Sequence, residues 1–126
     1  MHYNFNKETT FTSEEELLTI FSESEVRLRR GASVTFNGLI SLKGRVIFEG
    51  KNNISQDTDI DEGSIISNSD IGKGSKIRAY SLIYDSKFGS NNIIGPFCFV
   101  RDKCNIQNDC IIGNCVEVTR SNLNNG

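Results

Sequence analysis

A six-residue repeat runs through most of this chain and constrains its fold more than any other feature. From Phe36 onward an apolar residue opens each successive unit of six, and three of the units are shortened to five. The opening residues are Phe36, Leu42, Phe48, Ile54, Ile60, Ile66, Ile71, Ile77, Ile83, Phe88, Ile94, Val100, Ile106, Ile112, Val118 and Leu123. A helical period of 3.6 residues fails over this stretch, and strict alternation fails over long parts of it. The repeat therefore indicates a solenoid.

The repeat predicts an all-β fold, a parallel β-helix of hexapeptide units. Each unit supplies a short strand whose opening residue points inward, and three units close one triangular coil. The fifth position of most units is small or compact, as in Thr58, Ser64, Ser75, Ser81, Asn92, Cys98, Cys104, Cys110 and Val116. The three shortened units all fall on the same face of the prism, which supports this register. About five coils result, spaced about 4.8 Å apart.

The register assigns the opening residues to three inward stacks, one for each face of the prism. The first stack holds Ile54, Ile71, Phe88, Ile106 and Leu123. The second holds Leu42, Ile60, Ile77, Ile94 and Ile112, and the third holds Phe48, Ile66, Ile83, Val100 and Val118. We expect these side chains to be buried, with the intervening Gly, Asn and Asp residues at the coil corners.

The residues before the repeat are expected to close one end of the solenoid. We predict an N-terminal arm and capping helix over residues 1–29 and a β-helix domain over residues 30–126. Residues 12–21 predict one short helix, in which Ser13 and Glu16 have the spacing of a capping box. The helix would cover or flank the first coil, which has no preceding neighbour. Residues 1–10 are expected to form a loose or interface-dependent arm.

Composition excludes several classes of function. A formal net charge of -2 lacks the basic footprint of a nucleic-acid-binding protein. The apolar runs are too short to span a membrane, and the polar start without a signal region predicts a cytoplasmic protein. The sequence has one histidine, His2, which leaves little room for imidazole chemistry, and no metal site is predicted.

Two strings near the C-terminus resemble one enzyme family. Residues 94–101 read Ile-Gly-Pro-Phe-Cys-Phe-Val-Arg, and residues 113–118 read Gly-Asn-Cys-Val-Glu-Val. They resemble strings in the left-handed β-helix domain of the bifunctional N-acetylglucosamine-1-phosphate uridyltransferase / glucosamine-1-phosphate N-acetyltransferase. The likeness covers roughly residues 30–123. It implies a left-handed coil, whose hand the repeat itself does not show, and a threefold trimer.

The resemblance also implies a set of site residues. Arg101 matches an Arg that meets the sugar phosphate in the family, and Glu117 matches a Glu near that site. The family's Lys is replaced here by Thr119, which Arg120 follows. Arg101, Thr119 and Arg120 are therefore the candidate phosphate-binding residues, and Glu117 is the one candidate catalytic residue. The alternative is a solvated face on which Asp102 and Glu117 neutralise the arginines.

Two functions remain open from the sequence. The first is a non-catalytic assembly or sugar-phosphate-binding module, because the chain stops at Gly126, ahead of the family's general-base His and acetyl-CoA residues. The second is an acetyl-CoA-dependent acetyltransferase acting on an amino-sugar phosphate or nucleotide sugar. His2 would need a neighbouring subunit to bring it to Arg101. The expected partner is another copy of the chain, as a trimer or as an end-to-end pair.

Four cysteines cluster in the last third of the chain. Cys98, Cys104 and Cys110 occupy the fifth position on successive faces, so they point to different corners. This spacing predicts small buried side chains, because zinc ligands have to converge. Cys115 stands at the fourth position and is expected to be a reactive or interface thiol. No disulfide framework is expected.

Overall fold

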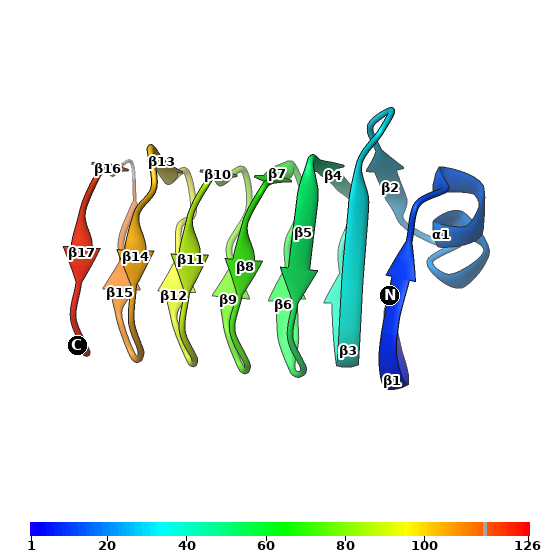
Figure 1. Ribbon diagram of the computed structural model, residues 1–126, viewed down its shortest axis with the longest axis horizontal. Helices are drawn as coiled ribbons and strands as arrows, with labels where there is room; N and C mark the ends of the chain where they lie inside the picture. The colour runs from blue at the N-terminus through cyan, green and yellow to red at the C-terminus, as the bar shows by residue number, and fades with distance from the viewer. Residues whose placement is uncertain (115) are drawn as a thin grey trace.

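The computed structural model describes residues 1–114 and 116–126, and its strands wind into a parallel β-solenoid of about five turns (Figure 1). In Figure 1 the chain advances from right to left, descends along the front and returns behind. The coil is therefore left-handed, as the resemblance implied. The predicted fold class is confirmed.

The third face of the prism is one sheet of six parallel strands. These are β2 (Glu25–Leu28), β4 (Arg45–Glu49), β7 (Ser64–Ser67), β10 (Leu82–Tyr84), β13 (Phe99–Arg101) and β16 (Glu117–Thr119). Neighbouring strands pair in register, so that equivalent residues of successive coils lie side by side. An outward side chain on this face therefore belongs to a column that runs along the solenoid axis.

The first and second faces are joined through β3 (Ser33–Leu42), which turns the corner between them. The first face continues through β5 (Lys51–Ile54), β8 (Asp70–Ile71), β11 (Lys87–Phe88), β14 (Asn105–Ile106) and β17 (Asn122–Leu123). The second continues through β6 (Thr58–Ile60), β9 (Lys76–Ile77), β12 (Ile93–Ile94) and β15 (Ile111–Ile112). Gly38 lies at the bend of β3 with a φ of 75°, where a side chain would collide with Gln56.

The three predicted stacks form the core. Every predicted stack residue is buried except Leu123, which lies in the last coil and is partly buried. The fifth positions are buried as well, apart from Val116, which is 38% exposed and does not fill its corner as expected. Polar corners also link the coils, because Ser86 Oγ accepts a hydrogen bond from the Cys104 backbone at 3.2 Å.

The N-terminal segment differs from the expectation. Residues 2–11 are not a loose arm but a strand, β1 (His2–Phe11), which pairs antiparallel with β3. Its Phe5 and Phe11 side chains are buried, and their rings join Phe36 in an aromatic cluster. This strand lies outside the six-residue repeat, so counting in units of six could not predict its pairing with β3.

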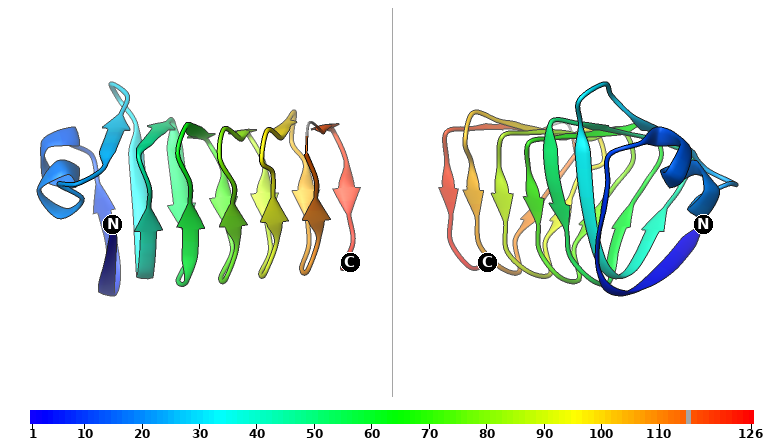
Figure 2. Two further views of the ribbon diagram at one scale, coloured as in Figure 1. Left: turned by 180° about the vertical axis from the view of Figure 1, so that it is seen from behind. Right: turned by 45° about the vertical axis from the view of Figure 1, so that its right-hand side comes forward.

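The predicted helix is present as α1 (Glu14–Ile20) and packs on the first coil (Figure 2). Its Leu17 is fully buried, as is Phe21 just after it. The capping box is wrong, because Ser13 makes no side-chain capping bond. Glu14 is instead tied to the next segment, where its Oε1 accepts the Leu28 backbone N–H at 3.0 Å. Among the described residues, no helix is long and apolar enough to cross a membrane.

Candidate functional site

Arg101 and Thr119 lie opposite each other on neighbouring strands β13 and β16, as the repeat predicted. The guanidinium of Arg101 contacts two carboxylates. Its Nε donates to Glu117 at 3.3 Å, and its Nη1 makes a short contact with Asp102. The same group lies 5.5 Å from the centre of the Phe99 ring. Arg101 therefore already has acceptors on two of its nitrogens.

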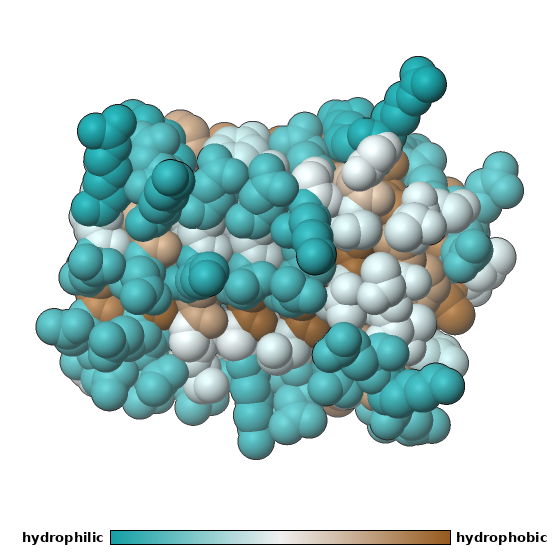
Figure 3. All heavy atoms as spheres, in the orientation of Figure 1, coloured by the Kyte–Doolittle hydropathy of each residue, from teal (hydrophilic) through white to brown (hydrophobic). Residues whose placement is uncertain are grey.

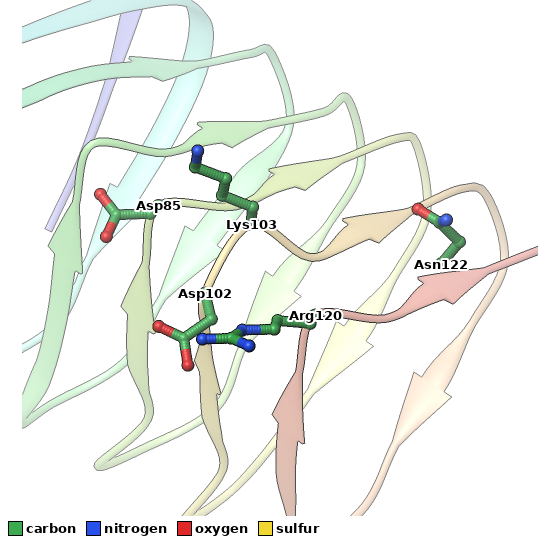
Figure 4. A pocket seen from close by; sticks show the side chains of 5 residues that line it. All are labelled: Asp85, Asp102, Lys103, Arg120 and Asn122. Carbon is green, nitrogen blue, oxygen red and sulfur yellow. The ribbon is translucent and has the colours of Figure 1, made fainter.

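A cavity of 440 Å³ lies at the corner beside these strands, lined by Asp85, Asp102, Lys103, Arg120 and Asn122 (Figure 4). Its lining carries two cations and two carboxylates. In Figure 4 the Arg120 side chain extends toward Asp102, whereas Lys103 points away from both. Lysine and arginine are suited to phosphate, but the two carboxylates would repel an anion. The cavity is therefore polar and balanced in charge.

The candidate catalytic residue Glu117 lies on the outside of the solenoid, where its carboxylate bonds Arg101. His2 is at the opposite end, in β1, whose N-terminal end is marked in Figure 1. General-base catalysis of acetyl transfer needs a group within hydrogen-bond reach of the attacking amine. Within one copy of the chain, no imidazole lies beside the Arg101–Glu117 pair.

The outer surface of the third face carries an apolar column that the sequence reasoning missed. Ile47, Ile65, Leu82 and Phe99 follow one another on β4, β7, β10 and β13, and all are half-buried. Tyr84 packs edge-on against Phe99, with ring centres 5.8 Å apart. Burial raises the pKa of the Tyr84 phenol, and the Glu49 carboxylate raises it further. This side of the solenoid therefore presents a column of partly exposed apolar side chains.

The first face is different in character. Its outward column is polar from end to end, with Asn53, Asp70, Lys87, Asn105 and Asn122 in successive coils. Figure 3 views this face and shows mainly hydrophilic side chains over the coils. The signal was present in the sequence. On the third face the residue before the inward position is apolar in four successive units, until Glu117 precedes Val118, whereas on the first face it is polar.

Apolar residues also gather at the corner between the second and third faces. The rings of Tyr80 and Phe97 stack there, with centres 5.7 Å apart and planes 6° apart, and both are more than half exposed. Gly63 lies beneath Tyr80, and a β-carbon at Gly63 would overlap the Tyr80 ring. On the second face Ile93 pairs with Ile111, which is 75% exposed. The apolar surface therefore extends around this corner.

The structure buries Cys98, Cys104 and Cys110 at the three corners of one coil, as predicted. Burial raises the pKa of the Cys98 thiol from its ordinary 9.0 to about 11. Cys115, expected to be the exposed thiol, lies outside the described residues. Among the residues described, no group of three His, Cys, Asp or Glu side chains is placed to hold a metal ion.

The family described as "Bacterial transferase hexapeptide (six repeats)" matches residues 85–120. Similar relatives include the "Bifunctional protein GlmU" of Clostridioides difficile (strain 630), at 40% identity over 81 residues. Those of Acaryochloris marina (strain MBIC 11017) and Geobacillus sp. (strain WCH70) are 35% identical over 97 and 106 residues. The three matches cover 64%, 72% and 84% of this chain and 17%, 21% and 21% of those proteins. The chain thus spans about a fifth of their length, and the resemblance of the two strings is confirmed.

Proposed function

We propose that this chain, a hexapeptide transferase-family domain related to the bifunctional GlmU proteins, is a non-catalytic assembly module whose copies pack side by side. One observation carries the proposal. The outward column of the third face is apolar over four successive coils, while that of the first face is polar throughout. A contiguous column of partly exposed apolar side chains of this kind is typical of a protein–protein interface.

The assembly we propose is a trimer, with the first faces directed to solvent. The third face and the corner at Tyr80 and Phe97 would supply the apolar interior. Aromatic side chains are enriched at such contacts, because they bury a large area at low cost in conformational entropy. The Arg101–Glu117 pair lies at the C-terminal end of the same face, where it would form part of the polar rim.

A second candidate is sugar-phosphate binding at the 440 Å³ cavity. It is favoured by Lys103 and Arg120, for which the described residues provide no ion pair within 4.0 Å. The matching site residues Arg101 and Thr119 adjoin the cavity on β13 and β16. Isothermal titration with N-acetylglucosamine-1-phosphate tests this role. Binding that is lost in Arg120→Ala and kept in Arg29→Ala, a matched change in an arginine outside the cavity, would support it.

The alternative of an acetyl-CoA-dependent acetyltransferase places Glu117 as the base. Release of free thiol from acetyl-CoA in the presence of glucosamine-1-phosphate measures this activity directly. We expect no release above background, since the Glu117 carboxylate is bonded by Arg101 and no imidazole of the same copy is near. Turnover that disappears in Glu117→Gln would identify Glu117 as the base and overturn the non-catalytic proposal.

Sedimentation equilibrium tests the assembly itself. The variant Leu82→Lys places a charge in the middle of the apolar column without touching the inward stack. Lys87→Glu is the matched control, since it changes a charge on the polar first face in the same coil. We expect trimers for the unchanged chain and for Lys87→Glu, and dissociation for Leu82→Lys. A 14.1 kDa monomer at micromolar concentration for the unchanged chain would contradict the proposal.

A further inference from the structure

The N-terminal end of the solenoid carries an open strand edge beside an aromatic pocket, and the proposed assembly uses neither. We propose that this end binds an extended peptide segment, which adds to β1 as one further strand. An apolar side chain of the segment would fill the pocket, and an acidic residue next to it would meet Lys7. This mode, in which main-chain bonds give affinity and a pocket gives specificity, is a recurring form of peptide recognition.

The open edge follows from the hydrogen bonding of β1. Met1 and Leu42 exchange both of their backbone bonds, each at 2.9 Å. In an antiparallel ladder such bonded pairs alternate with unbonded ones. The register of β1 with β3 then directs the N–H and C=O groups of Tyr3 toward β3, and those of His2 and Asn4 away from it. In the part of the chain that the structure describes, no strand or backbone hydrogen bond closes this outer edge.

The pocket lies directly beside that edge and has a volume of 340 Å³. Its walls include the rings of Tyr3, Phe5 and Phe11 from β1 and the Ile20 side chain from α1. Phe5 and Phe11 are almost fully buried, at 5% and 6% exposure, and Phe5 stacks on Phe36 with ring centres 5.2 Å apart. The pocket is thus the open end of the aromatic core. Its size and aromatic lining suit one large apolar side chain.

The shape of this end selects a single strand over a second copy of the chain. Figures 1 and 2 show α1 standing outside β1 at the N-terminal end, over part of the prism's cross-section. The helix would hold a second solenoid away from β1, whereas one extended segment needs only the strand spacing of about 4.8 Å. Figure 3 shows the less hydrophilic side chains of this view gathered over the same end.

The charge beside the pocket and the backbone geometry of β1 further restrict which peptide segments can bind. Lys7 is the one charged residue among those that the structure places around the pocket, so an acidic neighbour complements it. The ladder with β3 is irregular between Phe5 and Thr9, which interrupts the edge. The added strand is therefore short and pairs with His2 and Asn4, ahead of this irregularity. An irregular, charged edge also protects the chain from unselective strand pairing.

A fluorescein-labelled peptide, Thr-Val-Phe-Glu-Val-Thr with blocked ends, provides the probe, and fluorescence anisotropy measures its binding to the full chain. We expect saturable binding, with affinity reduced about tenfold or more when the probe's Phe is replaced by Ser. A probe with N-methyl groups on alternate backbone nitrogens should bind no better than background. A probe with Gln in place of Glu should bind more weakly and with less dependence on salt.

Two variants of the chain test the two halves of the site. Asn4→Pro removes an outward N–H and leaves the bonds to β3 in place, and Ile20→Asp puts a charge on the pocket wall. Both should abolish binding, whereas Lys87→Glu on the first face should not. If Asn4→Pro fails to fold, Ile20→Asp and the N-methylated probe still test whether the peptide binds at this pocket and strand edge. Absence of saturable binding by the parent probe, or equal binding by the N-methylated probe, would overturn the proposal. The proposal would also be overturned if the chains form a dimer that the probe dissociates, because a second copy would then be the occupant of this end.

Discussion

Replacing Ile77 with alanine tests the inward stacks at their centre. Ile77 is 1% exposed and lies between Ile60 and Ile94, its partners in the coils on either side. The change removes three carbons, worth about 2.4 kcal/mol in lost transfer free energy at about 0.8 kcal/mol each. A cavity term adds to this, because the paired strands hold both neighbours in place. We expect the free energy of unfolding to fall by about 3–4 kcal/mol, within the range for such changes.

Leu123→Ala is the matched comparison at the end of the first stack. Leu123 is only partly buried and pairs with Ile106 on one side, so the same kind of truncation should cost about 1 kcal/mol. Urea unfolding followed by circular dichroism, at one protein concentration for all samples, measures both values. Equal costs for the two variants would refute the stacking register, since one residue would then be no more enclosed than the other.

Three further predictions follow from local geometry. Gly63→Ala should lower the free energy of unfolding by about 1–2 kcal/mol, because its φ of 82° is strained for alanine and Tyr80 lies above it, while Gly113→Ala, with open space around it, should cost less in the same urea titration. The raised pKa of the Cys98 thiol means that the folded chain holds this proton more tightly than the unfolded chain. The free energy of unfolding should therefore fall as the pH rises from 9 through 11. The part of this fall that is due to the Cys98 thiol should be absent in Cys98→Ala. Urea midpoints measured across that pH range test both expectations. With a thiol reagent under native conditions, we expect three slow sites, Cys98, Cys104 and Cys110, and one fast site, Cys115; four equal rates would contradict the burial.

The repeat made the inward half of the structure predictable. A residue such as Ile66 or Ile94 opens its unit, and the unit length alone decides that it points inward. The same counting places Arg101 and Thr119 one coil apart, and they are paired in the structure. Such local, periodic information needs no knowledge of distant contacts. The stacks and the pairing of the candidate site residues could therefore be predicted before the structure was known.

The structure of the N-terminal end depends on contacts between residues far apart in the chain. There the predictions of a loose arm and of a capping box were wrong. Strand β1 forms because Phe5 and Phe11 find the ring of Phe36, a pairing that no repeat encodes. The capping box was also wrong: Ser13 makes no side-chain capping bond, and the carboxylate of the neighbouring Glu14 accepts the Leu28 backbone N–H. In both places the structure depends on contacts with the solenoid that the local sequence does not show.

The apolar column on the third face was missed although the repeat contains it. Leu82 and Phe99 are ordinary strand residues when considered one at a time. Counting units places them one coil apart, and the pairing of β10 with β13 confirms that they lie side by side. The sequence also offered Asp102 and Glu117 as carboxylates that neutralise the arginines, and in the structure both contact Arg101.

Hydroxyl-radical footprinting as a function of protein concentration tests the assembly most directly. It reports side-chain exposure residue by residue, and Phe99 and Tyr84 lie on the third face, while Tyr3 lies at the N-terminal end. We predict that oxidation of Phe99 and Tyr84 decreases as concentration rises through the association range, while oxidation of Tyr3 stays constant. Oxidation of Phe99 and Tyr84 that is independent of concentration while the chains associate would contradict assembly through the third face.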